Sequence, residues 1–297
     1  MEIQNLAYIG IESKKMKEWE EFGTKVLGLM LSESSNKECL KLRMDDRPFR
    51  IAVHKGSKEN FTYAGFELRD QTALNKAKED LKKANIKFKY GDKKLAQSRE
   101  VQELIIFEDP MGTIIELFHG RTLDYQRFIS PVGVSSFVTG EMGLGHIVLP
   151  AADLKKNYEF YTKILGFQDT DYMSFNMGDA DKDFSAGLHF LHCNNPRHHT
   201  IGLFESPHPN GLLHLMIEVP NLDEVGYALD RMNTAGISLQ STIGRHTNDQ
   251  MVSFYMISPS NFAIEFGYGG WQVDWEKFTP TISEAPSIWG HEFQVPE

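Results

Sequence analysis

The chain has 297 residues, of which 41% are hydrophobic and 24% charged, an ordinary balance for a globular protein large enough for two domains. Its formal net charge of -10 argues against nucleic acid or an anionic membrane as a partner, because both require basic patches. No apolar run approaches the ~18–20 residues that span a bilayer, and the N-terminus lacks the pattern of a signal peptide. We therefore expect a cytoplasmic protein in which Cys39 and Cys193 are reduced thiols.

The first predicted unit covers residues 6–31, which read LAYIGIESKKMKEWEEFGTKVLGLML. A β-rich run leads through a polar turn into an amphipathic helix, and Leu-Gly precedes the next strand. Residues 61–86 (FTYAGFELRDQTALNKAKEDLKKANI) form a second unit, with Asp before the helix and Asn at its end. The run KKANIKFKYGDKK is expected to be a solvated helix end and a loop, and DPMGTIIELFHG (109–120) closes this half with a strand.

The same pattern then repeats. Residues 144–167 (LGHIVLPAADLKKNYEFYTKILGF), 212–237 (LLHLMIEVPNLDEVGYALDRMNTAGI) and 258–269 (SPSNFAIEFGYG) match the three segments in order. Residues 121–141 have no counterpart and are interpreted as a linker. The sequence thus predicts an α+β fold of two domains, 1–133 and 134–297, with largely antiparallel strands and helices on one face of each sheet.

Aligning the halves brings out three positions. His146 falls opposite Tyr8, His214 opposite Tyr63, and Glu265 opposite Glu116. Side chains alternate along a strand, so His214, Met216 and Glu218 should face a cavity while the intervening apolar residues pack under the helices.

Two neutral imidazoles and one carboxylate form the facial triad of non-haem Fe(II) oxygenases, which leaves one face of the metal open. Taken alone, a histidine in a strand is more often structural, and Mn(II) accepts the same ligands. The repeat strengthens the interpretation because it selects matching positions in successive units. The sequence therefore predicts a metal site at His146, His214 and Glu265.

Longer segments support a family resemblance. The chain resembles the type I extradiol dioxygenases of the vicinal oxygen chelate superfamily, and among them the 2,3-dihydroxybiphenyl 1,2-dioxygenases. The resemblance spans essentially the whole chain and is carried by KLRMDDRPFRIAVHKG, FLHCNNPRHHTIGLFE, GRHTNDQMVSFYMISPSNFAIEFGYGG and the tail IWGHEF.

This resemblance implies paired βαβββ modules forming open, barrel-like sheets, with Fe(II) only in the C-terminal domain and O2 as co-substrate. It places the iron ligands at His146, His214 and Glu265, and the acid–base histidine at His199, chosen over His198 by its register with Thr200. His246 and Tyr255 match residues that hydrogen-bond the substrate or oxygen, and Asn248 and Asp249 match polar residues beside them. It also implies a homo-oligomer, with an octamer among the forms expected.

The implied activity is extradiol cleavage of an aryl-substituted or polycyclic catechol such as 2,3-dihydroxybiphenyl, in the breakdown of aromatic compounds. Candidates for lining the pocket are Met173, Phe175, Met177 and Leu191. Two alternatives stay open at this point. One is a metal-dependent, glyoxalase-like isomerase or transferase, which would not need the GRHTND segment and Tyr255. The other is a non-catalytic ligand-binding module, in which the triad would be broken.

Overall fold

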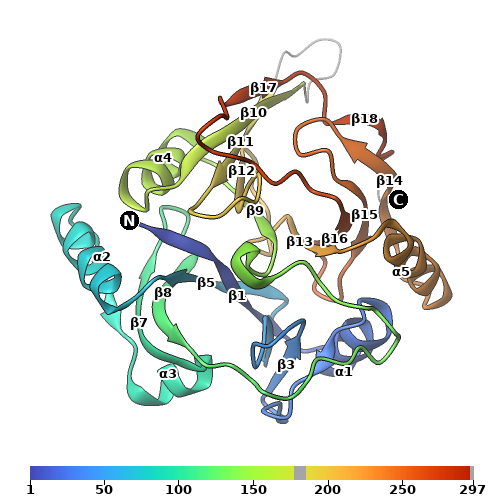
Figure 1. Ribbon diagram of the computed structural model, residues 1–297, viewed down its shortest axis with the longest axis horizontal. Helices are drawn as coiled ribbons and strands as arrows, with labels where there is room; N and C mark the ends of the chain where they lie inside the picture. Colours follow the sequence, from blue (N-terminus) through green and yellow to red (C-terminus); the bar gives the residue numbers. More distant parts are fainter. Residues whose placement is uncertain (177–184, 295–297) are drawn as a thin grey trace.

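The computed structural model describes residues 1–176 and 185–294. Over these residues the chain forms two mixed sheets, of eight and ten strands, that lie side by side with helices on their outer sides (Figure 1). Most neighbouring strands are antiparallel, which confirms the predicted α+β class.

The N-terminal half builds the eight-stranded sheet. Its elements are β1 (Ile3–Ser13), α1 (Met16–Glu21), the π-helical turn η1 (Phe22–Val26), β2 (Met30–Leu31), β3 (Cys39–Arg43), β4 (Ile51–Lys55), β5 (Asn60–Leu68), α2 (Gln71–Lys83), β6 (Lys89–Tyr90), α3 (Lys93–Arg99), β7 (Val101–Glu108) and β8 (Ile114–Arg121).

The C-terminal half builds the ten-stranded sheet after a short 3-10 turn. Its elements are η2 (Gly140–Met142), β9 (His146–Pro150), α4 (Leu154–Glu159), the π-helical turn η3 (Phe160–Ile164), β10 (Gln168–Asn176), β11 (Ser185–His192), β12 (Ile201–Phe204), β13 (His214–Val219), α5 (Leu222–Thr234), β14 (Leu239–His246), β15 (Val252–Ile257), β16 (Ala263–Tyr268), β17 (Thr281–Ser283) and β18 (Ser287–Gly290).

The two sheets repeat one strand order. The first runs β2-β3-β4-β1-β5-β8-β7-β6, and the second runs β10-β11-β12-β9-β13-β16-β15-β14 with β17 and β18 added at its two edges. The helix signals also repeat. The side chain of Asp70 caps α2 and that of Asn221 caps α5, and the helices are followed by left-handed Asn85 and Gly236 respectively. The repeat read from the sequence is therefore confirmed as a repeat of structure.

The halves differ in two elements. Residues 93–99 form α3, whose first turn is capped by Asp92; its first two residues belong to the run 82–94 that was predicted as a helix end and a loop. In the second half, the edge strand β14 extends as far as His246. The C-terminal tail runs from β17, which pairs with β10, to β18, which pairs with β14 (Figure 1).

One hydrophobic core joins both halves. Trp19 of α1 is fully buried, packs against Phe262, and donates a hydrogen bond from Nε1 to Ser260 Oγ at 2.8 Å. A second contact between the two halves is formed by Phe66, which packs edge-on against Phe167. The division near residue 133 falls between the two sheets and remains a prediction, because this shared core does not itself mark a boundary.

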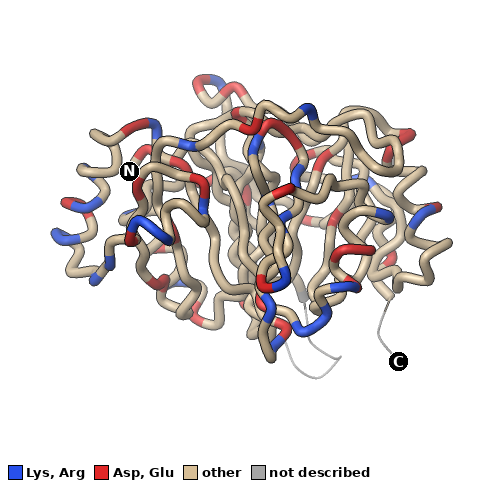
Figure 2. Tube along the Cα trace, turned by 90° about the horizontal axis from the view of Figure 1, so that it is seen from below, with Lys and Arg blue, Asp and Glu red and all other residues tan. Residues whose placement is uncertain are grey.

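The surface carries charges of both signs. Acidic and basic residues are interspersed along the trace (Figure 2). Within the described ranges, no helix is both long and apolar enough to cross a bilayer. Cys39 and Cys193 are free thiols, as expected.

Candidate active site

The three predicted metal ligands lie on neighbouring strands of the second sheet. His146 begins β9, His214 begins β13, and Glu265 lies in β16, which pairs with β13 on its other side. Antiparallel pairing sets His146 opposite Met216, and parallel pairing sets Met216 beside Glu265. The strands thereby bring side chains from positions 146, 214 and 265 to one point.

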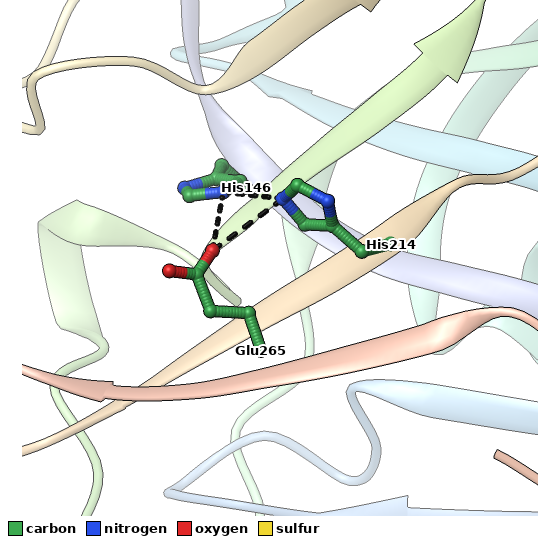
Figure 3. Close-up of side chains that lie close together, drawn as sticks. All are labelled: His146, His214 and Glu265. Atoms are coloured by element: carbon green, nitrogen blue, oxygen red, sulfur yellow. Dashed lines mark hydrogen bonds and ion pairs between the residues drawn. The ribbon is translucent and has the colours of Figure 1, made fainter. Parts of the chain in front are cut away.

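Figure 3 shows the three side chains converging. His146 Nε2 lies 3.1 Å from His214 Nε2 and 3.2 Å from Glu265 Oε2, and the third edge, from His214 Nε2 to Glu265 Oε2, is 3.4 Å. His146 and Glu265 are almost completely buried, whereas His214 is partly open.

This triangle fits a divalent metal. Ligand atoms about 2.1 Å from one ion and at right angles to one another would lie about 3.0 Å apart, close to the edges observed. Two imidazole nitrogens and a carboxylate oxygen are all electron-pair donors, so one cation satisfies them together. The donor set is the facial triad typical of non-haem Fe(II) sites.

The protonation of the ligands suits metal binding. Burial, together with the neighbouring His146, lowers the pKa of His214 to about 3, so its ring is neutral and its lone pair is available. Burial alone would raise the pKa of Glu265, but hydrogen bonds from His146 and His246 hold it well below its ordinary value. The site therefore offers the neutral imidazole of His214 and the carboxylate of Glu265 to a cation.

Gly145 explains how β9 comes so close to β13. A Cβ built at Gly145 would lie 1.9 Å from the carbonyl oxygen of Met216, and the residue has a φ of 149°. Only glycine can take this position, immediately before the ligand His146.

The structure confirms the predicted strand parity. In β9, Ile147 and Leu149 pack into the main core while His146 points away from it. In β13, Leu215, Ile217 and Val219 pack into the same core, while His214 and Met216 lie on the other face of the strand. Glu218 lies on the inner face, where its carboxylate binds buried Arg197 at 2.7 Å. Leu213, just before the strand, packs instead against the smaller inner cluster, because the alternation begins only at His214.

His199 lies on one side of the triad, just before β12. Its ring is 4.0 Å from that of His146 and 4.8 Å from that of Phe190, measured between centroids. Burial and the neighbouring His146 lower the pKa of His199 well below its ordinary value. His198 lines the same small cavity as His199 and has its Nδ1 3.1 Å from His199 Nδ1.

His246 and Tyr255 lie on the opposite side, at β14 and β15. His246 Nε2 is 2.8 Å from the Tyr255 hydroxyl and 3.1 Å from Glu265 Oε1, and its Nδ1 donates to the Pro286 carbonyl at 2.9 Å. Burial opposes protonation, but the carboxylate of Glu265 outweighs it and raises the pKa of His246 to about 9. Burial and the same carboxylate raise the pKa of Tyr255 well above its ordinary value, so the phenol keeps its proton.

Asn248 and Asp249 use their polar atoms within the turn after β14. Asn248 Oδ1 accepts from the backbone N–H of Asp249 at 2.8 Å, and Asp249 Oδ1 accepts from that of Met251 at 3.0 Å. Asp249 also lines a small cavity with His146 and His199. Direct binding of substrate by Asn248 and Asp249 remains a prediction.

An apolar cluster lines the inner side of the sheet beside His199. It consists of Val148, Met173, Leu188 and Phe190, with Phe175, Phe204 and Leu213 packed against it. Met173 and Phe175 belong to this cluster, and their lining of a substrate pocket remains a prediction. Leu191 does not belong to it, because it faces the opposite side of β11 and belongs to the main core. Met177 lies outside the described residues.

Two further groups contact the ligand carboxylate or its neighbour: Ser253, to which sequence reasoning gave no role, and His291, for which it suggested only that the tail covers the active domain. Ser253 Oγ donates to Glu265 Oε1 at 2.7 Å, and His291 of the tail lies 4.1 Å from the ring of His246. The only sequence signal was the motif IWGHEF, whose position far along the chain gave no indication of this contact.

Comparisons with known proteins agree with this geometry. The family described as Glyoxalase/Bleomycin resistance protein/Dioxygenase superfamily matches residues 143–266, and the family described as Dihydroxybiphenyl dioxygenase BphC D1 matches residues 6–56.

Three relatives align over nearly the whole chain. An iron-dependent extradiol dioxygenase of Rhodococcus jostii (strain RHA1) is 43% identical, with 99% of each chain covered. A biphenyl-2,3-diol 1,2-dioxygenase of Paraburkholderia xenovorans (strain LB400) is 40% identical, covering 98% of this chain and 96% of the relative. A 3-methylcatechol 2,3-dioxygenase of Pseudomonas putida (strain F1) is 39% identical, with both chains covered completely.

The crystal structure of BphC, a halotolerant catechol dioxygenase, superimposes with a TM-score of 0.91 at 34% identity, covering 98% of this chain and 95% of that one. Both sheets and both halves therefore have counterparts in a solved structure.

Proposed function

Since this chain belongs to the iron-dependent extradiol dioxygenases of the glyoxalase/bleomycin resistance protein/dioxygenase superfamily, we propose that its substrate is an aryl-substituted or polycyclic catechol such as 2,3-dihydroxybiphenyl. Cleavage next to the two hydroxyls would insert both atoms of O2. The observation that carries the proposal is the triad of His146, His214 and Glu265, with an apolar cluster beside it.

Iron held by these three residues supplies open coordination positions and electron transfer between a catechol and O2. The protein contributes the surroundings. Because His214 is the ligand with the most exposed side chain, the approach to the metal lies on its side of the triad.

His199 supports proton transfer. Its ring is neutral, fully enclosed and adjacent to His146, so it can accept a proton from a catechol hydroxyl and later return one to the oxygen derived from O2. A neutral imidazole carries one free lone pair for this exchange.

His246 and Tyr255 support substrate orientation on the other side. The Tyr255 phenol keeps its proton and lies 2.8 Å from His246 Nε2, so its oxygen can accept from His246 while its hydroxyl donates toward a substrate oxygen. Placing the base and the donors on opposite sides of the triad would fix which hydroxyl each one meets.

The apolar cluster supports the choice of an aryl-substituted ring. Phe190 packs against His199, and Val148, Met173 and Leu188 belong to the same apolar cluster. A second ring would bury apolar area there at about 25 cal/mol per Å2, which a bare catechol cannot gain.

A panel of catechols tests the proposal. We expect apoprotein reconstituted anaerobically with Fe(II), then mixed with air-saturated buffer, to consume one O2 per catechol and to form a yellow ring-opened product. The value of kcat/KM should be highest for 2,3-dihydroxybiphenyl or 1,2-dihydroxynaphthalene and lower for 3-methylcatechol and catechol. A preference for unsubstituted catechol would contradict the aryl specificity, and activity with Mn(II) but not Fe(II) would contradict the assignment of the metal.

The enzyme is further proposed to act in the cytoplasm as a homo-oligomer, as the family resemblance implies. Light scattering coupled to size exclusion gives the mass directly: the octamer is expected, and a mass equal to the 33.9 kDa chain would contradict assembly.

A further inference from the structure

The two oxygens of Glu265 have different neighbours. Oε2 faces the two histidine ligands, at 3.2 Å from His146 Nε2 and 3.4 Å from His214 Nε2. Oε1 faces the opposite way, where Ser253 Oγ lies at 2.7 Å and His246 Nε2 at 3.1 Å. One oxygen is thus available to the metal while the other is held by the protein.

The hydrogen bonds beyond Oε1 have a defined direction. A carboxylate only accepts, so the Ser253 hydroxyl donates to Glu265. Ser253 Oγ can then accept from its other neighbour, His291 Nε2, at 3.2 Å, and the same N–H also lies 3.1 Å from the Ser253 carbonyl oxygen. With its proton on Nε2, neutral His291 accepts at Nδ1, where the Ser287 hydroxyl lies at 2.6 Å. The chain runs Ser287 to His291 to Ser253 to Glu265, and every group in it has a matching partner.

The backbone of the tail fixes the His291 ring in this position. Gly290 and His291 are both left-handed, with φ of 72° and 54°, so the tail turns sharply inward at the end of β18. Gly290 pairs with Gly244 of β14, and a Cβ at Gly244 would lie 2.4 Å from His291 N. A glycine at 244 is therefore needed for the tail to come this close.

The tail is also anchored before it reaches this turn. Thr281 and Ser283 donate hydroxyl hydrogen bonds to the two oxygens of buried Asp171, at 2.7 and 2.6 Å. From there the chain crosses to Pro286, whose carbonyl accepts from His246. Both edges of the second sheet hold this segment, so His291 is 6% exposed although the residues around it are open to solvent.

We propose that Ser253 and His291 are positioning residues for the metal centre: they hold Glu265 Oε1 so that Oε2 is presented with His146 and His214 in one fixed orientation. His291, more than 140 residues along the chain from His146, makes the C-terminal tail a working part of the iron site. The inference rests on the metal site and not on which catechol is the substrate.

Metal affinity tests this without substrate. The apoprotein of each variant is titrated anaerobically with Fe(II) against a chelator of known affinity, and its thermal unfolding is recorded in parallel. Groups that orient metal ligands typically contribute about 10–100-fold to affinity, so Ser253→Ala should bind iron about 10–100-fold more weakly, and His291→Phe about 10-fold. Phe keeps the ring packing against His246 and removes only the hydrogen bonds.

Three variants serve as controls. Ser253→Thr retains the hydroxyl, and His291→Gln retains a donor toward Ser253, so both should restore most of the affinity. His119→Phe makes the same change as His291→Phe at an equally buried histidine of the N-terminal half, whose Nε2 lies 2.9 Å from Gln71 Oε1, and should leave iron binding unchanged.

The outcomes separate clearly. Unchanged affinity in Ser253→Ala and His291→Phe overturns the proposal, and an equal loss in His119→Phe overturns it as well, because the effect would then be general. If His291→Phe does not fold, the comparison of His291→Gln with Ser253→Ala and Ser253→Thr decides. Weakened iron binding with normal kcat at saturating iron supports positioning, whereas full affinity with lost kcat overturns it.

Discussion

The guanidinium of Arg99 binds the carboxylate of Glu116 through two nitrogen–oxygen contacts, each of 2.9 Å. It also lies 3.9 Å above the ring of Tyr63, while the Tyr8 hydroxyl donates to Glu116 at 2.8 Å. Tyr8, Tyr63 and Glu116 are the residues that align with the iron ligands. In the N-terminal half they enclose a cation supplied by the chain itself, at the end of α3.

Glycines make room for the two tyrosines. Across the strand pair β1–β5, Tyr8 lies opposite Gly65 and Tyr63 opposite Gly10. A Cβ at Gly65 would lie 2.2 Å from the Tyr8 ring, and one at Gly10 would lie 2.1 Å from the Tyr63 ring. The ligands of the second half face Met216 and Val148 instead, because imidazole rings are smaller.

Removing Arg99 should destabilise the protein. Arg99→Leu leaves the buried carboxylate of Glu116 without its counter-ion, at a cost of about 3–5 kcal/mol in the free energy of unfolding. The double variant Arg99→Leu, Glu116→Leu should recover most of this loss, since neither charge remains. Denaturant unfolding of the apoproteins measures both, and a cost in the single variant below about 1 kcal/mol would contradict the pairing.

Filling the space beside Tyr8 should also be costly. Gly65→Ala forces a methyl group against the phenol ring and should cost about 1–3 kcal/mol. Gly226→Ala in α5 is the matched control: its Cβ meets no atom within 4 Å, and alanine favours a helix by about 0.5–1 kcal/mol. Opposite signs for the two substitutions are expected, and a stabilised Gly65→Ala would argue against close packing there.

Loss of the carboxylate ligand should abolish iron binding. Glu265→Gln should weaken Fe(II) binding by more than about 100-fold, because it removes a ligand and not merely a group that orients one. Glu116→Gln, the same change at the aligned position, should retain iron. Metal analysis after dialysis distinguishes them. Stringent chelation should remove activity and Fe(II) should restore it; an enzyme fully active after chelation would refute the metal site.

His199→Ala should separate binding from turnover. The variant keeps all three ligands, so iron content and anaerobic catechol binding should be close to those of the parent enzyme. Turnover should fall by about 100- to 10,000-fold because general acid–base catalysis is lost. Single-turnover kinetics with the reconstituted protein gives the rate, and an unchanged kcat would remove His199 from this role.

The pH dependence of stability should contain a contribution from His54. Burial and the neighbouring Arg99 lower the pKa of His54 from 6.5 to about 4, and its Nε2 lies 2.7 Å from the Tyr63 hydroxyl. A lowered histidine pKa means that the folded state favours the neutral ring. The resulting stability is complete above about pH 6.5 and is lost as the pH falls toward 4.

The variant His54→Gln should therefore show a weaker loss of unfolding free energy between pH 7 and pH 5 than the parent apoprotein. Both are compared because other buried histidines titrate in the same range. Parallel pH profiles for the two proteins would show that His54 does not contribute.

The sequence alone determined the repeat, the class of fold and the triad. Hydrophobic alternation and helix caps are local signals, so residues 6–31 and 144–167 could be matched without knowledge of their contacts. Comparing the two copies then isolated His146, His214 and Glu265, because a repeated fold places aligned residues at equivalent points. The roles of His199, His246 and Tyr255 came from the family resemblance and remain predictions.

Only the tertiary structure decided what surrounds these positions. Arg99 binds Glu116, at the place that aligns with the metal site, because of the direction in which α3 ends. His291 reaches Ser253 because the tail pairs with the edge of a sheet formed earlier in the chain. Leu191 was assigned to the wrong face for the same reason. Such contacts depend on the pairing and register of strands that are far apart in the sequence, and the spacing of residues along the chain does not predict them.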